Sequence, residues 1–123
     1  MTYSKPMRSR LLTVVETTVF VRQAEKIWND EERSALVDHV ARNPESGVVI
    51  PDTGGVRKLR WGRSGSGKRG GARVIYFYYQ PDVPLYLLLA YAKAEREDMS
   101  QDEKRAVAEF AARLKRPATQ GKS

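Results

Sequence analysis

Three segments rich in apolar, β-branched and aromatic residues follow one another in the second half of the chain and constrain its fold more than any other feature. They cover Val56 to Trp61, Arg73 to Gln80 and Leu85 to about Lys93. Only residues 81–84, a turn with two prolines, separate the last two segments. Strands joined by so short a loop pair antiparallel. The chain is therefore expected to contain an antiparallel sheet of consecutive strands.

Two capping boxes indicate the helices that accompany this sheet. Asn29 is followed three residues later by Glu32, and Ser100 is followed at the same spacing by Glu103. In a capping box the two side chains satisfy backbone N–H groups that the first helical turn leaves without partners. Apolar residues at helical spacing follow both boxes, so one helix is expected after each.

The segment from Thr17 to Arg22 is rich in β-branched residues and predicts a first strand. The order is then β-α-β-β-β-α, which indicates an α+β fold: a small, mainly antiparallel four-stranded sheet with its helices packed on one face. With 123 residues, 41% of them hydrophobic, the chain is long enough for a single core. We expect one domain over residues 13–115, a flexible N-terminus over 1–12 and a flexible tail over 116–123.

Composition excludes several classes of site. The chain has no cysteine, so it can form neither a disulfide nor a Cys-ligated metal site, and a reducing, cytoplasmic location is expected. Its longest apolar run, Leu85 to Ala92, is far shorter than the roughly 20 residues that span a bilayer. Its one histidine, His39, rules out a paired-imidazole ribonuclease and a multi-histidine metal site. We expect no metal and no cofactor.

The positive charge of the chain is concentrated in one stretch. The net charge is +7, and residues 53–81 contain no acidic residue. Concentrated positive charge attracts polyanions, of which nucleic acid is the commonest in a cytosol. The stretch carries seven basic residues, equal to the whole net excess: Arg57, Lys58, Arg60, Arg63, Lys68, Arg69 and Arg73.

A glycine-rich part of this stretch imitates a phosphate-binding loop. Residues 62–68, GRSGSGK, satisfy the G-x-x-x-x-G-K spacing, but Arg69 replaces the serine or threonine that would hold magnesium. Two glycines and a strand follow where a helix would have to begin, so no helix N-terminus is available for the phosphate. We interpret the segment as a hairpin loop whose Lys68 and Arg69 bind a phosphate backbone.

Three blocks at fixed spacing, RKLRW, GKRGGARVIY and YAKAERED, resemble the HigB-type branch of the RelE toxin superfamily. The resemblance covers residues 14–114. It implies a small sheet packed on helices and the toxin of a type II toxin–antitoxin module, an endoribonuclease that cleaves mRNA on the ribosome. The implied partners are a cognate antitoxin, often of the helix-turn-helix type, the ribosome with its mRNA, and operator DNA through the antitoxin.

The same resemblance implies site residues. Basic residues that alternate along one strand look like Lys58 and Arg60, an arginine that opens the next strand looks like Arg73, and a later basic residue looks like Lys93. Arg73 is then the main phosphate binder and, with Lys93 and Glu95, the candidate catalytic set. The strand period places Lys58 and Arg60 on one face of the sheet.

The group that transfers protons is open at this point. Some RelE toxins use a tyrosine as a candidate base, but the corresponding place here is about Met99-Ser100, and Tyr91 lies too early in the sequence to align. Cationic side chains can stabilise the phosphorane formed when a 2′-hydroxyl attacks its own phosphate, without a metal. Two alternatives stay open: a protein that binds nucleic acid without cutting it, and an inactive family member whose basic groove docks an acidic antitoxin segment.

Overall fold

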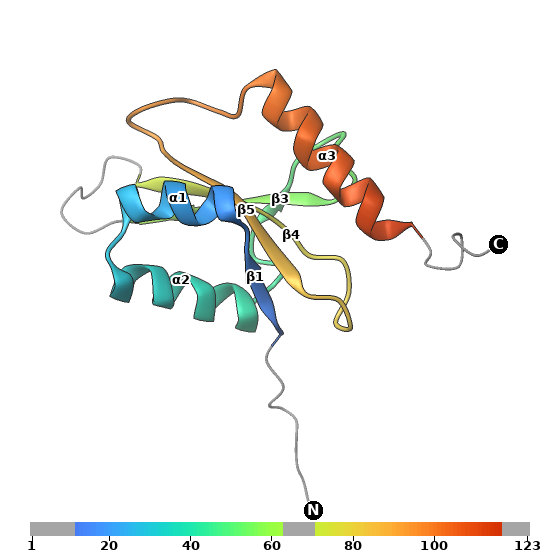
Figure 1. Cartoon of the computed structure of the whole chain (residues 1–123), viewed down its shortest axis with the longest axis horizontal. Coiled ribbons are helices and arrows are strands. Elements are labelled where there is room, and N and C mark those ends of the chain that lie inside the picture. The colour runs from blue at the N-terminus through green and yellow to red at the C-terminus, as the bar shows by residue number, and fades with distance from the viewer. Residues whose placement is uncertain (1–11, 63–70, 117–123) are drawn as a thin grey trace, which may run out of the picture.

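The computed structural model describes residues 12–62 and 71–116, which form three helices and one five-stranded sheet (Figure 1). In chain order the elements are β1 (Val14–Glu16), α1 (Thr18–Ile27), α2 (Asp30–Arg42), β2 (Val48–Val49), β3 (Val56–Trp61), β4 (Ala72–Phe77), β5 (Leu85–Ala92) and α3 (Gln101–Lys115).

The strands lie in the order β1-β5-β4-β3-β2. β1 runs parallel to β5, and the other three neighbouring pairs are antiparallel. The predicted α+β class and the antiparallel pairing of the three consecutive strands are thus confirmed. The described residues form five strands instead of four, because two short edge strands of three and two residues, β1 and β2, complete the sheet.

The strand predicted over Thr17 to Arg22 is wrong, because this segment begins helix α1. The Thr17 side chain caps the helix by accepting a hydrogen bond from the Phe20 backbone N–H at 3.4 Å. Phe20 and Ala24, one helical turn apart, are completely buried, whereas Val19 is exposed. Burial of one helical face therefore outweighs the β propensity of the individual residues. The true first strand, β1, lies just before this segment.

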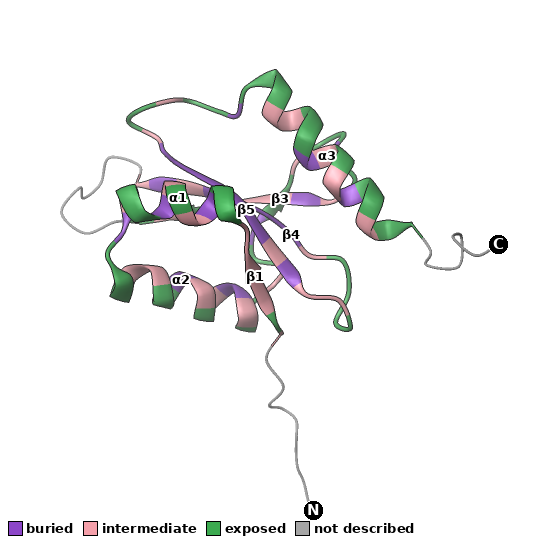
Figure 2. Cartoon of the chain, in the orientation of Figure 1, coloured by how far each residue is buried: buried purple, intermediate pink, exposed green. Residues whose placement is uncertain are grey.

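The sequence had suggested that all helices pack on one face of the sheet, but they pack on both faces. The buried residues of α1 and α2 pack with Val74 and Tyr76 of β4, whereas those of α3 pack with Ile75 and Phe77 of the same strand. In Figure 1, α2 and α3 lie on opposite sides of the strands. Because alternate residues of a strand point to opposite faces, β4 is buried on both sides and separates two cores. Figure 2 shows the buried residues gathered along β4 and β5.

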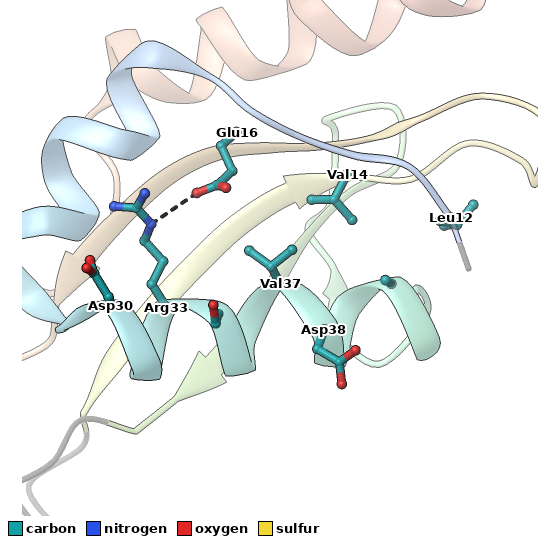
Figure 3. A pocket seen from close by; sticks show the side chains of 9 residues that line it. Leu12, Val14, Glu16, Asp30, Arg33, Val37 and Asp38 are labelled. Carbon is teal, nitrogen blue, oxygen red and sulfur yellow. Dashed lines mark ion pairs between the residues drawn. The ribbon is translucent and has the colours of Figure 1, made fainter. Parts of the chain in front are cut away.

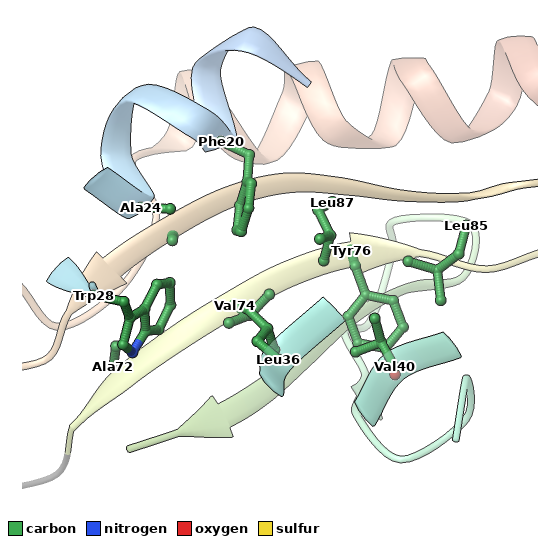
Figure 4. Packing of buried hydrophobic residues seen from close by; sticks show 11 residues of the cluster. Phe20, Ala24, Trp28, Leu36, Val40, Ala72, Val74, Tyr76, Leu85 and Leu87 are labelled. Carbon is green, nitrogen blue, oxygen red and sulfur yellow. The ribbon is translucent and has the colours of Figure 1, made fainter. Parts of the chain in front are cut away.

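The core on the side of α1 and α2 anchors the edge of the sheet through one tyrosine (Figure 4). The Tyr76 side chain is fully buried between the sheet and Val40 of α2. Its hydroxyl accepts a hydrogen bond from the Gly47 backbone N–H at 2.9 Å and donates one to the Pro44 carbonyl at 2.8 Å. This hydroxyl fixes the segment that leads into β2.

Candidate nucleic-acid interface

Strands β3 and β4 bring the three basic residues that were predicted on strands to one face of the sheet. Arg60 pairs directly with Arg73, and Lys58 pairs with Ile75, which belongs to the core beneath α3. Leu59 packs on the opposite core, as the strand period predicted. Like charges placed directly opposite each other destabilise a sheet. The Arg60–Arg73 pair therefore contributes little to sheet stability and makes this face of the sheet a candidate for binding an anion.

These three residues line a cavity of about 610 Å³. Its cationic part is completed by Lys104 from the first turn of α3, and its single carboxylate is Asp98. The opposite wall is apolar and comes from β2 and the residues after it. We call this the basic cavity; its lining consists of Ser46, Val48, Val49, Ile50, Pro51, Lys58, Leu59, Arg60, Arg73, Asp98 and Lys104.

Asp98 sits between two of the four cations. Its Oδ1 lies 3.5 Å from Lys58 Nζ, and its Oδ2 lies 3.7 Å from Lys104 Nζ. Oδ1 also accepts a hydrogen bond from the Met99 backbone N–H at 2.7 Å. This hydrogen bond is the main reason that the pKa of Asp98 lies below its usual value, and the two lysines lower it further against the opposing effect of burial. Asp98 is therefore a carboxylate anion at neutral pH.

A buried tyrosine lies beside the basic cavity. Tyr91 pairs with Arg73 across β4 and β5 and is only 4% exposed. Its hydroxyl makes no hydrogen bond with any described residue. Burial raises the pKa of this hydroxyl and the charge of Asp98 raises it further, while Arg73 and Arg96 oppose the shift. The hydroxyl therefore keeps its proton at neutral pH and is available as a donor.

Arg96 covers the ring of this tyrosine. Its guanidinium carbon lies 4.8 Å from the centre of the Tyr91 ring. The same guanidinium donates two hydrogen bonds to the Glu103 carboxylate, at 2.8 and 3.2 Å. Glu103 also belongs to the capping box of α3. The start of α3 is thus tied to the turn after β5, and this tie holds Asp98 and Lys104 at the cavity.

The structure does not bring all the predicted site residues into this cavity. Lys93 follows the last residue of β5, where its backbone N–H donates to the Gly71 carbonyl, and its side chain pairs with Glu97 at 3.4 Å. Glu95 is exposed in the turn that follows. Neither residue lines the basic cavity. Lys68 and Arg69 lie outside the described residues.

Sequence reasoning missed Lys104, Asp98 and Tyr91. The sequence did contain one signal for Lys104. A cation in the first turn of a helix interacts unfavourably with the helix dipole, so its presence there indicates a role other than stabilising the helix. Asp98 and Tyr91 belong to the YAKAERED block, but the spacing of a motif does not show which of its side chains face a neighbouring strand. Pairing across the sheet decides that.

A second cavity, of about 580 Å³, lies between β1 and α2 on the other face of the sheet (Figure 3). Arg33 points toward Glu16, and the two form an ion pair at 3.2 Å. Asp30 and Asp38 add two more carboxylates to its lining. With three carboxylates and one cation, this cavity repels a polyanion, whereas the basic cavity, with four cations and one carboxylate, attracts one.

The chemistry available in the basic cavity is electrostatic. Among the described residues, no cluster of three His, Cys, Asp or Glu side chains is arranged to hold a metal ion. His39 does not line the basic cavity: its ring is tilted against that of Trp61, with centres 5.0 Å apart, and its Nε2 lies 3.2 Å from the hydroxyl of Ser46, a residue of the cavity lining. Within the described part of the chain, no helix is long and apolar enough to cross a membrane.

Comparisons with known proteins agree with this fold. A family model described as the RelE toxin of the RelE/RelB toxin–antitoxin system matches residues 12–121. Among solved structures, a double arginine-to-alanine mutant of the E. coli toxin RelE in the free state is similar, with a TM-score of 0.53 and 12% sequence identity. The similarity covers 82% of this chain and 97% of that chain.

Proposed function

The chain belongs to the RelE toxin family, and we propose that it is a ribosome-dependent mRNA endonuclease of the HigB type that acts at the basic cavity. The observation that carries the proposal is the direct pairing of Arg60 with Arg73 on a cavity wall that also holds Lys58 and Lys104. A phosphodiester in contact with two guanidiniums and two ammonium groups is held by charge, and its extra charge in a transition state is stabilised.

The proposed reaction is attack by a ribose 2′-hydroxyl on the adjacent phosphorus. The bond from the 2′-oxygen to phosphorus forms, the bond from phosphorus to the 5′-oxygen breaks, and the products are a 2′,3′-cyclic phosphate and a 5′-hydroxyl. Arg73 and Arg60 stabilise the phosphorane that forms between these two steps. One proton leaves the 2′-oxygen and one is supplied to the 5′-oxygen, so both a proton acceptor and a proton donor are needed.

The residues proposed to transfer these protons lie in the turn after β5. Lys93 lies two residues beyond Tyr91, in the turn that follows β5. We propose Lys93 and Glu95 as the candidates for proton transfer, although neither lines the basic cavity in the free protein. Lys68 and Arg69, which lie outside the described residues, are proposed to bind the RNA backbone.

The proposed partners follow from the family. As the toxin of a two-gene module, the chain binds an antitoxin, for which we propose the helix-turn-helix type, and reaches operator DNA only through it. Its substrate is mRNA in the ribosomal A site. The proposed setting is the cytoplasm, where the ribosome, the mRNA and the operator are all found.

Controlled expression without the antitoxin tests the proposal. Wild-type protein should arrest growth and truncate cellular messages, and Arg73→Ala should relieve both effects. Arg22→Ala is the matched control, because Arg22 is an exposed arginine on α1, on the face of the sheet opposite α3. Harmless expression of folded wild-type protein would overturn the proposal. Arrest with intact messages would favour binding of nucleic acid without cleavage.

A further inference from the structure

We propose that Lys58 and Lys104 form a binding site for one RNA phosphate and that the Asp98 carboxylate occupies this site in the free protein. When the phosphate binds, the Asp98 side chain rotates away and accepts a hydrogen bond from the Tyr91 hydroxyl. The ligand class is a phosphodiester of single-stranded RNA. The inference rests on the proposed function, because it assigns a binding site and a positioning residue within the basic cavity.

The geometry of Asp98 is that of an internal substitute for a phosphate. Each of its carboxylate oxygens faces a different ammonium group, Oδ1 facing Lys58 and Oδ2 facing Lys104. Two non-bridging oxygens of a phosphodiester can present the same pair of acceptors. The two lysines come from β3 and α3, so the carboxylate joins parts of the chain that no strand pairing connects.

These contacts are weak enough to be exchanged. At 3.5 and 3.7 Å they are longer than the 2.7–3.2 Å that is typical of N–H···O hydrogen bonds. The side chains of Lys58, Asp98 and Lys104 are 33%, 45% and 36% exposed, so water screens both pairs. A carboxylate held in this way can yield its place to a phosphate that also contacts Arg60 and Arg73.

Tyr91 supplies the place to which Asp98 turns. Its hydroxyl is buried and has no hydrogen-bond partner among the described residues, which is a costly state for a donor. Asp98 already acts on this hydroxyl through its charge and as a nearby side-chain acceptor, although the two groups do not reach hydrogen-bond geometry. If Oδ1 keeps its hydrogen bond to the Met99 N–H, rotation of the carboxylate lets it accept a hydrogen bond from Tyr91. RNA binding would then satisfy a donor that is unsatisfied in the free protein.

Binding of a 2′-O-methyl single-stranded RNA tests the inference, because this probe cannot be cleaved by its own 2′-oxygen. Asp98→Asn should bind at least threefold more tightly than wild type, because it removes the competing carboxylate. The dependence of log K on log salt should steepen by about 0.7 for each lysine that gains a phosphate contact. Asp38→Asn is the matched control, since Asp38 also pairs with a cation, Arg42, but lies on α2; its affinity should stay within about 1.5-fold of wild type.

Two further variants separate the parts of the inference. Lys104→Gln should weaken RNA binding. In a double variant that carries both Lys104→Gln and Asp98→Asn, most of the increase in affinity expected of Asp98→Asn alone should disappear. Tyr91→Phe should weaken binding by about threefold in the wild-type background and have no effect in the Asp98→Asn background, since the two groups act on the same step. Neither Lys104→Gln nor Tyr91→Phe removes a side-chain hydrogen bond that holds the core, so the variants should stay folded.

Each outcome distinguishes the inference from the proposed function. If wild type binds the probe and Asp98→Asn binds no more tightly, or more weakly, Asp98 is a support for Lys58 and Lys104 and the inference is overturned. If Asp98→Asn and Asp38→Asn increase RNA affinity equally, the effect is explained by net charge alone, and the inference is also overturned. If no variant binds the probe at low salt, the inference is overturned, whereas the proposed function, whose substrate is mRNA on the ribosome, is judged separately by growth arrest and message truncation.

Discussion

Two buried tyrosines on neighbouring strands should differ in how much stability they lose when their hydroxyl groups are removed. Tyr76 of β4 and Tyr91 of β5 are 0% and 4% exposed. The Tyr76 hydroxyl makes two hydrogen bonds to backbone groups, at 2.9 and 2.8 Å, whereas the Tyr91 hydroxyl makes none with the described residues. Substitution by phenylalanine removes the oxygen and keeps the ring, so each variant isolates one hydroxyl.

The expected magnitudes follow from these contacts. Two hydrogen bonds at about 1 kcal/mol each make Tyr76→Phe destabilising by about 2 kcal/mol, because the Gly47 N–H is left buried without an acceptor. For a domain of this size, that lowers the melting temperature by roughly 8 °C. Tyr91→Phe removes a buried donor that has no acceptor, so stability should change by less than about 0.5 kcal/mol or should increase.

Thermal and denaturant unfolding of wild type and both variants at neutral pH measures this difference. A fall of similar size in the two variants would show that Tyr91 has a partner in solution, and it would refute the reasoning about its hydroxyl. A Tyr76→Phe variant that melts within about 2 °C of wild type would show that the β2 edge is not held by Tyr76. RNA binding by Tyr91→Phe should fall although its stability does not.

Three other changes test separate parts of the structure. Gly47→Ala should cost about 1–3 kcal/mol in denaturant unfolding, since its Cβ would lie 3.0 Å from both the Lys58 carbonyl oxygen and the Tyr76 hydroxyl. Glu103→Gln should cost about 1 kcal/mol at pH 7. The hydrogen bond from Arg96 holds the pKa of Glu103 below its ordinary value of 4.5, so this contribution is present above that value and disappears as the pH falls. The stability difference from wild type should therefore close in unfolding curves taken toward pH 3. Arg60→Ala should reduce the salt slope of RNA binding by about 0.7, whereas Arg22→Ala should leave it unchanged.

The central sheet was predictable because its sequence signals are local. The three apolar segments become β3, β4 and β5, and a short turn joins the last two. The capping boxes at Asn29 and Ser100 form as expected, with both hydrogen bonds of each box present. A continuous apolar run such as the one in β4 is typical of a strand buried on both faces, and this signal could have placed α3 opposite the other helices.

The beginning of the domain was not predictable from propensity. Thr18, Val19 and Val21 favour a strand one by one, but the spacing of Phe20 and Ala24 buries one face of a helix against the sheet. That burial depends on a surface formed by β4 and β5, more than 40 residues later. Local preference therefore gives the wrong element where tertiary packing decides.

The candidate site was predictable in part, for the same physical reason. Lys58, Arg60 and Arg73 could be placed on one face because strand alternation and hairpin pairing are regular. Their meeting with Asp98 and Lys104 depends on how α3 returns over the sheet, which no local pattern contains. Lys93 and Glu95, chosen from a motif, instead lie beyond the end of β5.

The chemistry of the RNA ends made by purified protein on programmed, translating ribosomes shows whether the 2′-hydroxyl is the nucleophile and whether Arg73 supports the cleavage. We expect a 5′-hydroxyl and a 2′,3′-cyclic phosphate, loss of cutting when the cleaved nucleotide carries a 2′-O-methyl group, and a loss of about 10²-fold or more in Arg73→Ala. Ends with a 5′-phosphate, cutting next to a 2′-O-methyl group, or unchanged cutting by Arg73→Ala would contradict it.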